Sequence, residues 1–113
     1  MILSTFALLA GVALLAIGST LAHAYTSSGT GEWTCAAFNQ AEQFGKQLGH
    51  QWVVGYLSGL SNGSGTDVLA HTDCSAVTTW IDRYCVSHPL DYVYQGADQL
   101  SVELLRRQNA QER

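Results

Sequence analysis

The stretch from Trp52 to Leu60 constrains the fold of this chain more than any other part of the sequence. Its apolar residues recur at steps of one, three and four: Trp52, Val53, Tyr56, Leu57 and Leu60. Residues at this spacing lie on one side of an α-helix, so the stretch predicts a helix with a wide apolar face. Polar residues on both sides leave it well short of the about 20 apolar residues that span a membrane. We therefore expect a buried helix, residues 50–60, at the centre of a small all-α domain.

Two glycines, Gly55 and Gly59, lie four residues apart within the same stretch. Each glycine inside a helix costs about 1 kcal/mol relative to alanine, so some other interaction should offset that cost. Close approach of the backbone of another helix is the simplest candidate. The residues expected to form the core or an apolar interaction surface are therefore Trp52, Val53, Gly55, Tyr56 and Gly59, together with Trp80.

The first 24 residues differ in composition from the rest of the chain. They carry no charged side chain and end in Ala22-His23-Ala24, a small-x-small pattern that signal peptidase accepts. We expect cleavage after Ala24 and export to the periplasm. An uncleaved membrane anchor is the alternative, because the apolar run approaches the about 20 residues needed to span a bilayer. The expected parts are a signal peptide (1–24), a flexible leader (25–32), a helical domain (33–106) and a polar tail (107–113).

The charged side chains all follow residue 24, and the formal net charge is −4 at pH 7. This mild acidity argues against nucleic acid or an anionic membrane surface as a partner. Cleavage after Ala24 would leave 89 of the 113 residues, a length at which a covalent link commonly supports the core. Export to an oxidising compartment would permit a disulfide.

The chain has three cysteines, Cys35, Cys74 and Cys85, so one thiol is left over. If Asp73 to Ser87 forms a helix, Cys74 and Cys85 lie about 16 Å apart, whereas a disulfide needs Cα atoms within roughly 7 Å. Cys35 therefore pairs with one of them. We favour Cys85, because it falls on the apolar face of that helix while Cys74 lies in its first turn. A bridge from Cys35 to Cys85 closes a loop of about 50 residues and stabilises by about 4 kcal/mol in the chain-entropy model.

Residues that could carry chemistry form no recognisable motif. His71, Asp73 and Cys74 are close in sequence, but no second ligand pair has zinc-like spacing. Ser58, Cys74 and Ser75 are candidate nucleophiles without an evident base and orienting group. We therefore predict no catalytic, cofactor or metal site, and a protein that is not an enzyme. Capping, loop or solvated positions are expected for the histidines and two helical acids: His50, His71, His88, Asp82 and Asp98.

Four helices are expected in the domain. The first covers residues 35–48, with Thr34 as its N-cap and Gly49 as its end. The central helix follows at 50–60, and glycine and serine then form a loop over 61–66. The side chains expected to point inward from the first helix are Phe38, Ala41 and Phe44.

The third and fourth helices are expected on either side of His88-Pro89. The third runs over residues 73–87, with Thr72 or Asp73 as its cap. The fourth starts at Pro89, which suits the first position of a helix, and the polar residues after 107 should fray. Its apolar side chains recur at helical spacing: Leu90, Val93, Ala97, Leu100 and Leu104.

Three short segments carry a resemblance to a known family. They are Trp-Thr-Cys-Ala-Ala-Phe at 33–38, Trp-Val-Val-Gly-Tyr at 52–56 and Tyr-Cys-Val-Ser-His-Pro at 84–89. In this order they resemble the HdeA/HdeB family of periplasmic acid-stress chaperones, over most of residues 33–105. The resemblance implies a four-helix fold, a bridge between Cys35 and Cys85, and homodimers at neutral pH. It also implies a function, because in that family acid loosens the dimer and exposed apolar surface then holds unfolding client proteins.

A weaker similarity points to the Rap/Tai type of periplasmic immunity protein, which blocks peptidoglycan-cutting toxins. Those proteins also combine a Gly-Tyr-x-x-Gly helix, here at 55–59, with a helical fold bridged by cysteines. The sequence thus favours a holdase-type chaperone, with an immunity or inhibitor protein as the alternative. Both readings imply a protein partner and no cofactor.

Overall fold

The computed structural model describes residues 28–112, which form an all-α bundle. A 3₁₀ turn, η1 (Thr30–Glu32), precedes four helices: α1 (Cys35–Gln40), α2 (Gln43–Ser64), α3 (Cys74–Ser87) and α4 (Val93–Gln111). Within these residues the only β-type pairing is an isolated bridge between Thr34 and Tyr92. The predicted fold class and number of helices are therefore confirmed. The predicted signal peptide lies outside the described residues.

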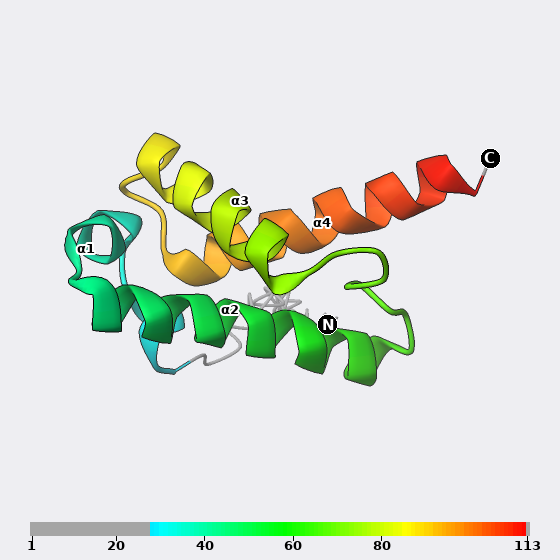
Figure 1. The fold of residues 1–113 in the computed structure, drawn as a ribbon, viewed down its shortest axis with the longest axis horizontal. Helices are drawn as coiled ribbons and strands as arrows, with labels where there is room; N and C mark the ends of the chain where they lie inside the picture. The colour runs from blue at the N-terminus through cyan, green and yellow to red at the C-terminus, as the bar shows by residue number, and fades with distance from the viewer. Residues whose placement is uncertain (1–27, 113) are drawn as a thin grey trace, which may run out of the picture.

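The helices are arranged in two layers around one core. Helix α2 runs along one side, α3 and α4 lie together on the other, and α1 closes the end where α2 begins and α3 ends (Figure 1). Among residues 28–112, no helix is both long and apolar enough to cross a membrane. The core side chains come from every helix and from the α2–α3 connection: Cys35, Phe38, Val53, Leu57, Val68, Val77, Ile81, Cys85, Val93, Ala97, Leu100 and Leu104.

A disulfide joins Cys35 at the start of α1 to Cys85 near the end of α3, with a Cα–Cα distance of 4.7 Å. Both cysteines are fully buried. Cys74, in the first turn of α3, is a free and exposed cysteine. The predicted pairing is therefore confirmed, and the disulfide links the short helix α1 to the rest of the bundle.

The boundary between the first two helices differs from the prediction. The chain leaves α1 at Ala41 and Glu42, which are both extended, and α2 then runs without a break through Gly49. Gly49 is needed for packing, since a β-carbon there would lie 2.6 Å from the ring of Phe38. The prediction that Gly49 ends a helix is wrong. Because the turn comes earlier, Phe44 does not point inward and is exposed.

Helix α2 also extends further toward its C-terminus than predicted. It includes residues 61–64, and Gly65 ends it in the left-handed conformation with φ 74°. This is the usual glycine cap at a helix C-terminus. The connection to α3 is therefore residues 65–73, and Asp73 caps α3 by accepting a hydrogen bond from the N–H of Ala76 (2.8 Å).

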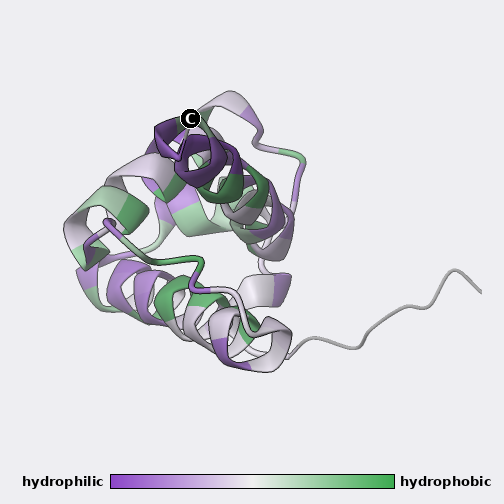
Figure 2. Cartoon of the chain, turned by 90° about the vertical axis from the view of Figure 1, so that its right-hand side faces the viewer, coloured by the Kyte–Doolittle hydropathy of each residue, from purple (hydrophilic) through white to green (hydrophobic). Residues whose placement is uncertain are grey.

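Helix α4 begins at Val93, four residues after the predicted start at Pro89. The carbonyls of Pro89 and Asp91 accept hydrogen bonds from Ala36 (2.9 Å) and Cys35 (2.7 Å), which holds this connection, with a turn at residues 89–90, beside α1. Leu90, predicted on the apolar side of the fourth helix, lies in this turn and is exposed. Helix α4 continues to Gln111, so it includes most of the polar tail that was predicted to fray after residue 107. Its last turns are hydrophilic, as the purple helix near the C-terminus in Figure 2 shows.

Residues 28–32 are folded against α2, although the sequence predicted them as part of a flexible leader. The indole N–H of Trp52 donates to the carbonyl of Ser28 (2.8 Å), and the Thr30 hydroxyl donates to the carbonyl of Leu48 (3.2 Å). A β-carbon at Gly31 would lie only 2.2 Å from the Trp52 ring. Trp52 therefore fixes the segment that enters α1.

Candidate interaction surface

The residues that the sequence singled out on the central helix divide between core and solvent. Val53 and Leu57 are fully buried, and Tyr56 is half-buried beside them. Gly55 and Gly59 are exposed, with no atom within 4 Å of a β-carbon built on either. The predicted helix contact at these glycines is wrong for the part of the chain that the structure describes. Each glycine lies two residues from a core residue, and two residues correspond to about 200° around a helix.

Trp52 and Tyr56 form a second layer over the core instead. Their rings stack with centroids 5.2 Å apart and an interplanar angle of 13°. The Tyr56 hydroxyl donates to the carboxylate of Asp98 on α4. The pKa of Tyr56 is raised to about 12, mainly by this hydrogen bond and secondly by burial of the ring. Asp98, expected on a solvated face, therefore links α4 to α2.

A second link joins α2 to α3. His50 Nε2 lies 2.7 Å from Asp82 Oδ1, and the His50 ring packs edge-on against Phe38 with centroids 5.5 Å apart. The sequence placed His50 at a helix boundary and Asp82 on a solvated face. Because α2 begins earlier than predicted, His50 lies within it and reaches across to α3.

A third link joins α3 to the segment before α4. The Tyr84 hydroxyl donates to Asp91 Oδ2. The pKa of Tyr84 is raised to about 12, mainly by burial and secondly by this hydrogen bond. All three of these links between helical segments thus end on an aspartate side chain, so their strength depends on the charge of a carboxylate.

Four large apolar side chains are exposed near α1. Phe44 and Leu48, in the first two turns of α2, are 71% and 43% exposed. Val86, in the last turn of α3, is 72% exposed, and Leu90, in the connection to α4, is 90% exposed. We call these four residues the apolar end.

Helix α1 holds the segments of the apolar end together. The N–H of Ala36 donates to the carbonyl of Pro89 (2.9 Å), and the side-chain amide of Asn39 donates to the carbonyl of Cys85 (2.9 Å). Only two residues separate α1 from the start of α2. Figure 1 shows α1 at the end of the bundle where α2 begins and α3 ends. The sequence did not predict this surface, because its residues come from three separate segments of the chain.

A groove lies between α3 and α4. Three rings from α3 and its C-cap line one wall: Trp80, Tyr84 and His88. These rings recur at steps of four residues, a spacing visible in the sequence, although only Trp80 was predicted as part of a core or interaction surface. Residues of α4 line the other wall, and the cavity has a volume of about 550 Å³.

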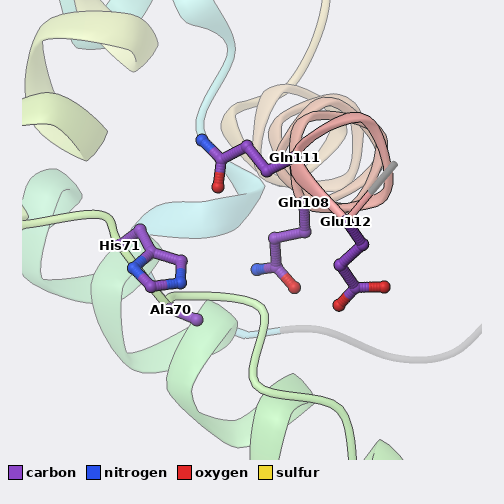
Figure 3. A pocket seen from close by; sticks show the side chains of 5 residues that line it. All are labelled: Ala70, His71, Gln108, Gln111 and Glu112. Carbon is purple, nitrogen blue, oxygen red and sulfur yellow. The ribbon is translucent and has the colours of Figure 1, made fainter.

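A smaller cavity of about 360 Å³ lies where the α2–α3 connection meets the end of α4. His71 has a left-handed backbone conformation there, with φ 65°, and faces Gln108, Gln111 and Glu112 (Figure 3). The Gln108 amide donates to backbone carbonyls of the connection, at 2.8 and 3.1 Å, and so fixes it to α4. Residues 28–112 contain no group of three or more His, Cys, Asp or Glu side chains that could hold a metal ion.

Comparison of the chain with known protein families, curated proteins and solved structures finds no match in any of the three.

Proposed function

We propose that this protein is a small exported holdase-type chaperone of the periplasm, which binds unfolded proteins through the apolar end. The observation that carries the proposal is the exposure of Phe44, Leu48, Val86 and Leu90 around one short helix. Apolar side chains exposed at one end of a bundle are candidate contacts for another protein. An unfolded client offers complementary apolar side chains, and burying them together is favourable by about 25 cal/mol per Å².

The three aspartate-terminated links support an acid response. At about pH 2–3 most carboxylates in proteins are protonated, and a neutral carboxyl group accepts hydrogen bonds more weakly than a carboxylate. The contacts Tyr56–Asp98, His50–Asp82 and Tyr84–Asp91 each depend on an aspartate as hydrogen-bond acceptor. The bundle loosens, and more of its core becomes available to a client.

The disulfide supports reversibility of that loosening. Cys35 and Cys85 keep α1 attached to α3 at any pH, because the covalent bond does not titrate. The segments that carry the apolar end then stay close to one another while the contacts between helices weaken. A reduced chain lacks this restraint and should unfold in acid rather than present a surface.

The direct test is an aggregation assay with the exported, oxidised protein and an acid-sensitive client enzyme, at about pH 2–3 and at pH 7. We expect suppression of light scattering in acid, and loss of suppression when the disulfide is reduced. Absence of suppression at both pH values would rule the proposal out.

A matched pair of variants locates the surface. Val86→Ser removes an apolar side chain that is 72% exposed within the apolar end, and Ala76→Ser changes an exposed apolar residue of α3 outside it. Val86→Ser should weaken suppression, and more so when combined with Leu90→Ser, whereas Ala76→Ser should leave it unchanged. Equal effects of the two single variants would show that clients bind elsewhere.

A further inference from the structure

The groove between α3 and α4 has a wall built from stacked rings. The Trp80 and Tyr84 rings lie with centroids 5.3 Å apart at an interplanar angle of 15°. The Tyr84 and His88 rings lie 4.1 Å apart at 14°. Trp80 and Tyr84 are half-buried and His88 is exposed, so the wall is open to solvent along its length.

This wall is fixed before any ligand arrives. The Tyr84 ring packs on Gly96 of α4, where a β-carbon would come within 2.8 Å of it. The Tyr84 hydroxyl is held by Asp91 Oδ2, and the His88 ring Nδ1 lies 2.9 Å from the Tyr84 carbonyl. A preformed wall lowers the cost of ordering side chains on binding.

The charge of the groove is uneven. The lining includes the carboxylates Asp91 and Glu103 and no lysine or arginine. Glu103 is already paired, because Arg106 and Arg107 donate to its two oxygens at 2.7 to 3.0 Å. Asp91, by contrast, receives only the Tyr84 hydroxyl, and its Oδ1 accepts no side-chain hydrogen bond from residues 28–112. The negative charge that is free to attract a ligand therefore lies at the Asp91 end.

Polar and apolar groups along the groove are also free to receive a ligand. Within the described residues, the Trp80 indole N–H and the Gln99 amide make no hydrogen bond to the protein, although both line the groove. Val102, on the opposite wall, is 62% exposed. The two free donors suit the backbone carbonyls of an extended peptide, and Val102 suits one of its apolar side chains.

We propose that this groove binds an extended peptide segment in which an arginine stands next to an apolar residue. The guanidinium stacks on the outer face of the exposed His88 ring and donates to Asp91, while the apolar side chain covers Val102. Arginine fits better than lysine, because its planar group both stacks on aromatic rings and donates in a fixed geometry to a carboxylate. The groove shares none of its lining residues with the apolar end, and the proposal does not rest on the holdase function.

The test measures binding of two acetylated, amidated peptides, Gly-Val-Arg-Val-Gly and the same peptide with neutral citrulline in place of arginine. Titrations use the exported, oxidised protein at pH 7 and low salt, followed by calorimetry and by backbone amide NMR shifts. We expect the citrulline peptide to bind at least about tenfold more weakly, with the largest shifts at residues 80–91 and 99–103. Equal affinities for the two peptides, or shifts centred on other residues, would overturn the proposal.

Variants of the protein separate the groove from general acidity. Asp91→Asn keeps an acceptor for Tyr84 and should weaken the arginine peptide about fivefold to tenfold. Asp67→Asn removes an exposed carboxylate outside the groove and should change the affinity less than twofold. If Asp91→Asn does not fold, Val102→Lys provides the second test, since it adds a positive charge at an exposed position on the groove wall. Unchanged binding by either groove variant would contradict the proposed groove site. Equally tight binding of acetylarginine amide alone would also contradict it, because the rest of the peptide would then contribute nothing to affinity.

Discussion

Gly49 and Gly55 belong to the same helix but meet different surroundings. A β-carbon at Gly49 would approach Phe38 to 2.6 Å, whereas one at Gly55 would meet no atom within 4 Å. Phe38 is buried beside the disulfide, so its ring has little room to move away. The first glycine is thus required by packing, and the second only lowers the helical propensity of α2.

Alanine at these two positions should therefore have opposite effects on the free energy of unfolding. Gly49→Ala should lower it by about 1–3 kcal/mol through overpacking. Gly55→Ala should raise it by about 0.5–1 kcal/mol, because alanine favours the helix and faces solvent there. Urea denaturation followed by circular dichroism measures both. A stabilising Gly49→Ala would show that α1 can move off α2 at little cost.

Tyr56 and Tyr84 make stability depend on pH in the alkaline range. Each has a folded-state pKa raised to about 12, by Asp98 and burial for Tyr56 and by burial and Asp91 for Tyr84. An unfolded tyrosine ionises near pH 10. The contribution of each tyrosine is therefore complete below about pH 10 and is lost as the pH rises toward 12.

We expect the urea midpoint to fall between about pH 10 and 12. The double variant Tyr56→Phe with Tyr84→Phe should have a lower midpoint at pH 8 and a flatter profile above pH 10. A profile as steep in the double variant as in the parent would assign the alkaline loss to other groups.

Sequence reasoning succeeded at residues whose role is local. Thr34 and Asp73 cap their helices through hydrogen bonds three residues along the chain, which a sequence displays directly. The partners of Tyr56 and His50 lie 42 and 32 residues away, so their aspartates looked like ordinary solvated acids. The role of Gly49 was missed for the same reason, because its neighbour Phe38 belongs to another helix.

At the scale of the elements, α1 depends most on the disulfide. It has six residues, too few to be stable as a helix alone, and Cys35 binds it to α3. The expected helix 35–48 would have been more independent. Its early end at Ala41 and the late start of α4 both follow from how α1 packs against neighbours distant in sequence, which periodicity does not reveal.

Removing the disulfide tests how far the stability of α1 depends on it. The pair Cys35→Ser with Cys85→Ser should lower the free energy of unfolding by about 2–4 kcal/mol. Cys74→Ser is the matched control, since it replaces an exposed free cysteine, and should change it by less than about 0.5 kcal/mol. If the double variant were as stable as the parent, the noncovalent contacts of α1 would suffice to hold it.

For the whole molecule, acid should loosen the bundle without separating its parts. The links between α2, α3 and α4 each end on an aspartate, whereas the disulfide is covalent and does not titrate. We expect near-ultraviolet circular dichroism to decrease at about pH 2–3 while the far-ultraviolet signal persists, with binding of a hydrophobic dye. Adding reductant in advance should abolish the far-ultraviolet signal too. An unchanged near-ultraviolet spectrum in acid would show that the links do not control opening.

The contact between Trp52 and residues 28–31 gives the molecule an optical reporter. The indole covers Gly31 and donates to the carbonyl of Ser28, so its fluorescence depends on whether that segment stays attached. In a chain whose other two tryptophans are replaced by phenylalanine, release of the segment would expose the ring to water. Its emission would shift to longer wavelength, and the shift would time the first step of opening separately from the melting of the helices.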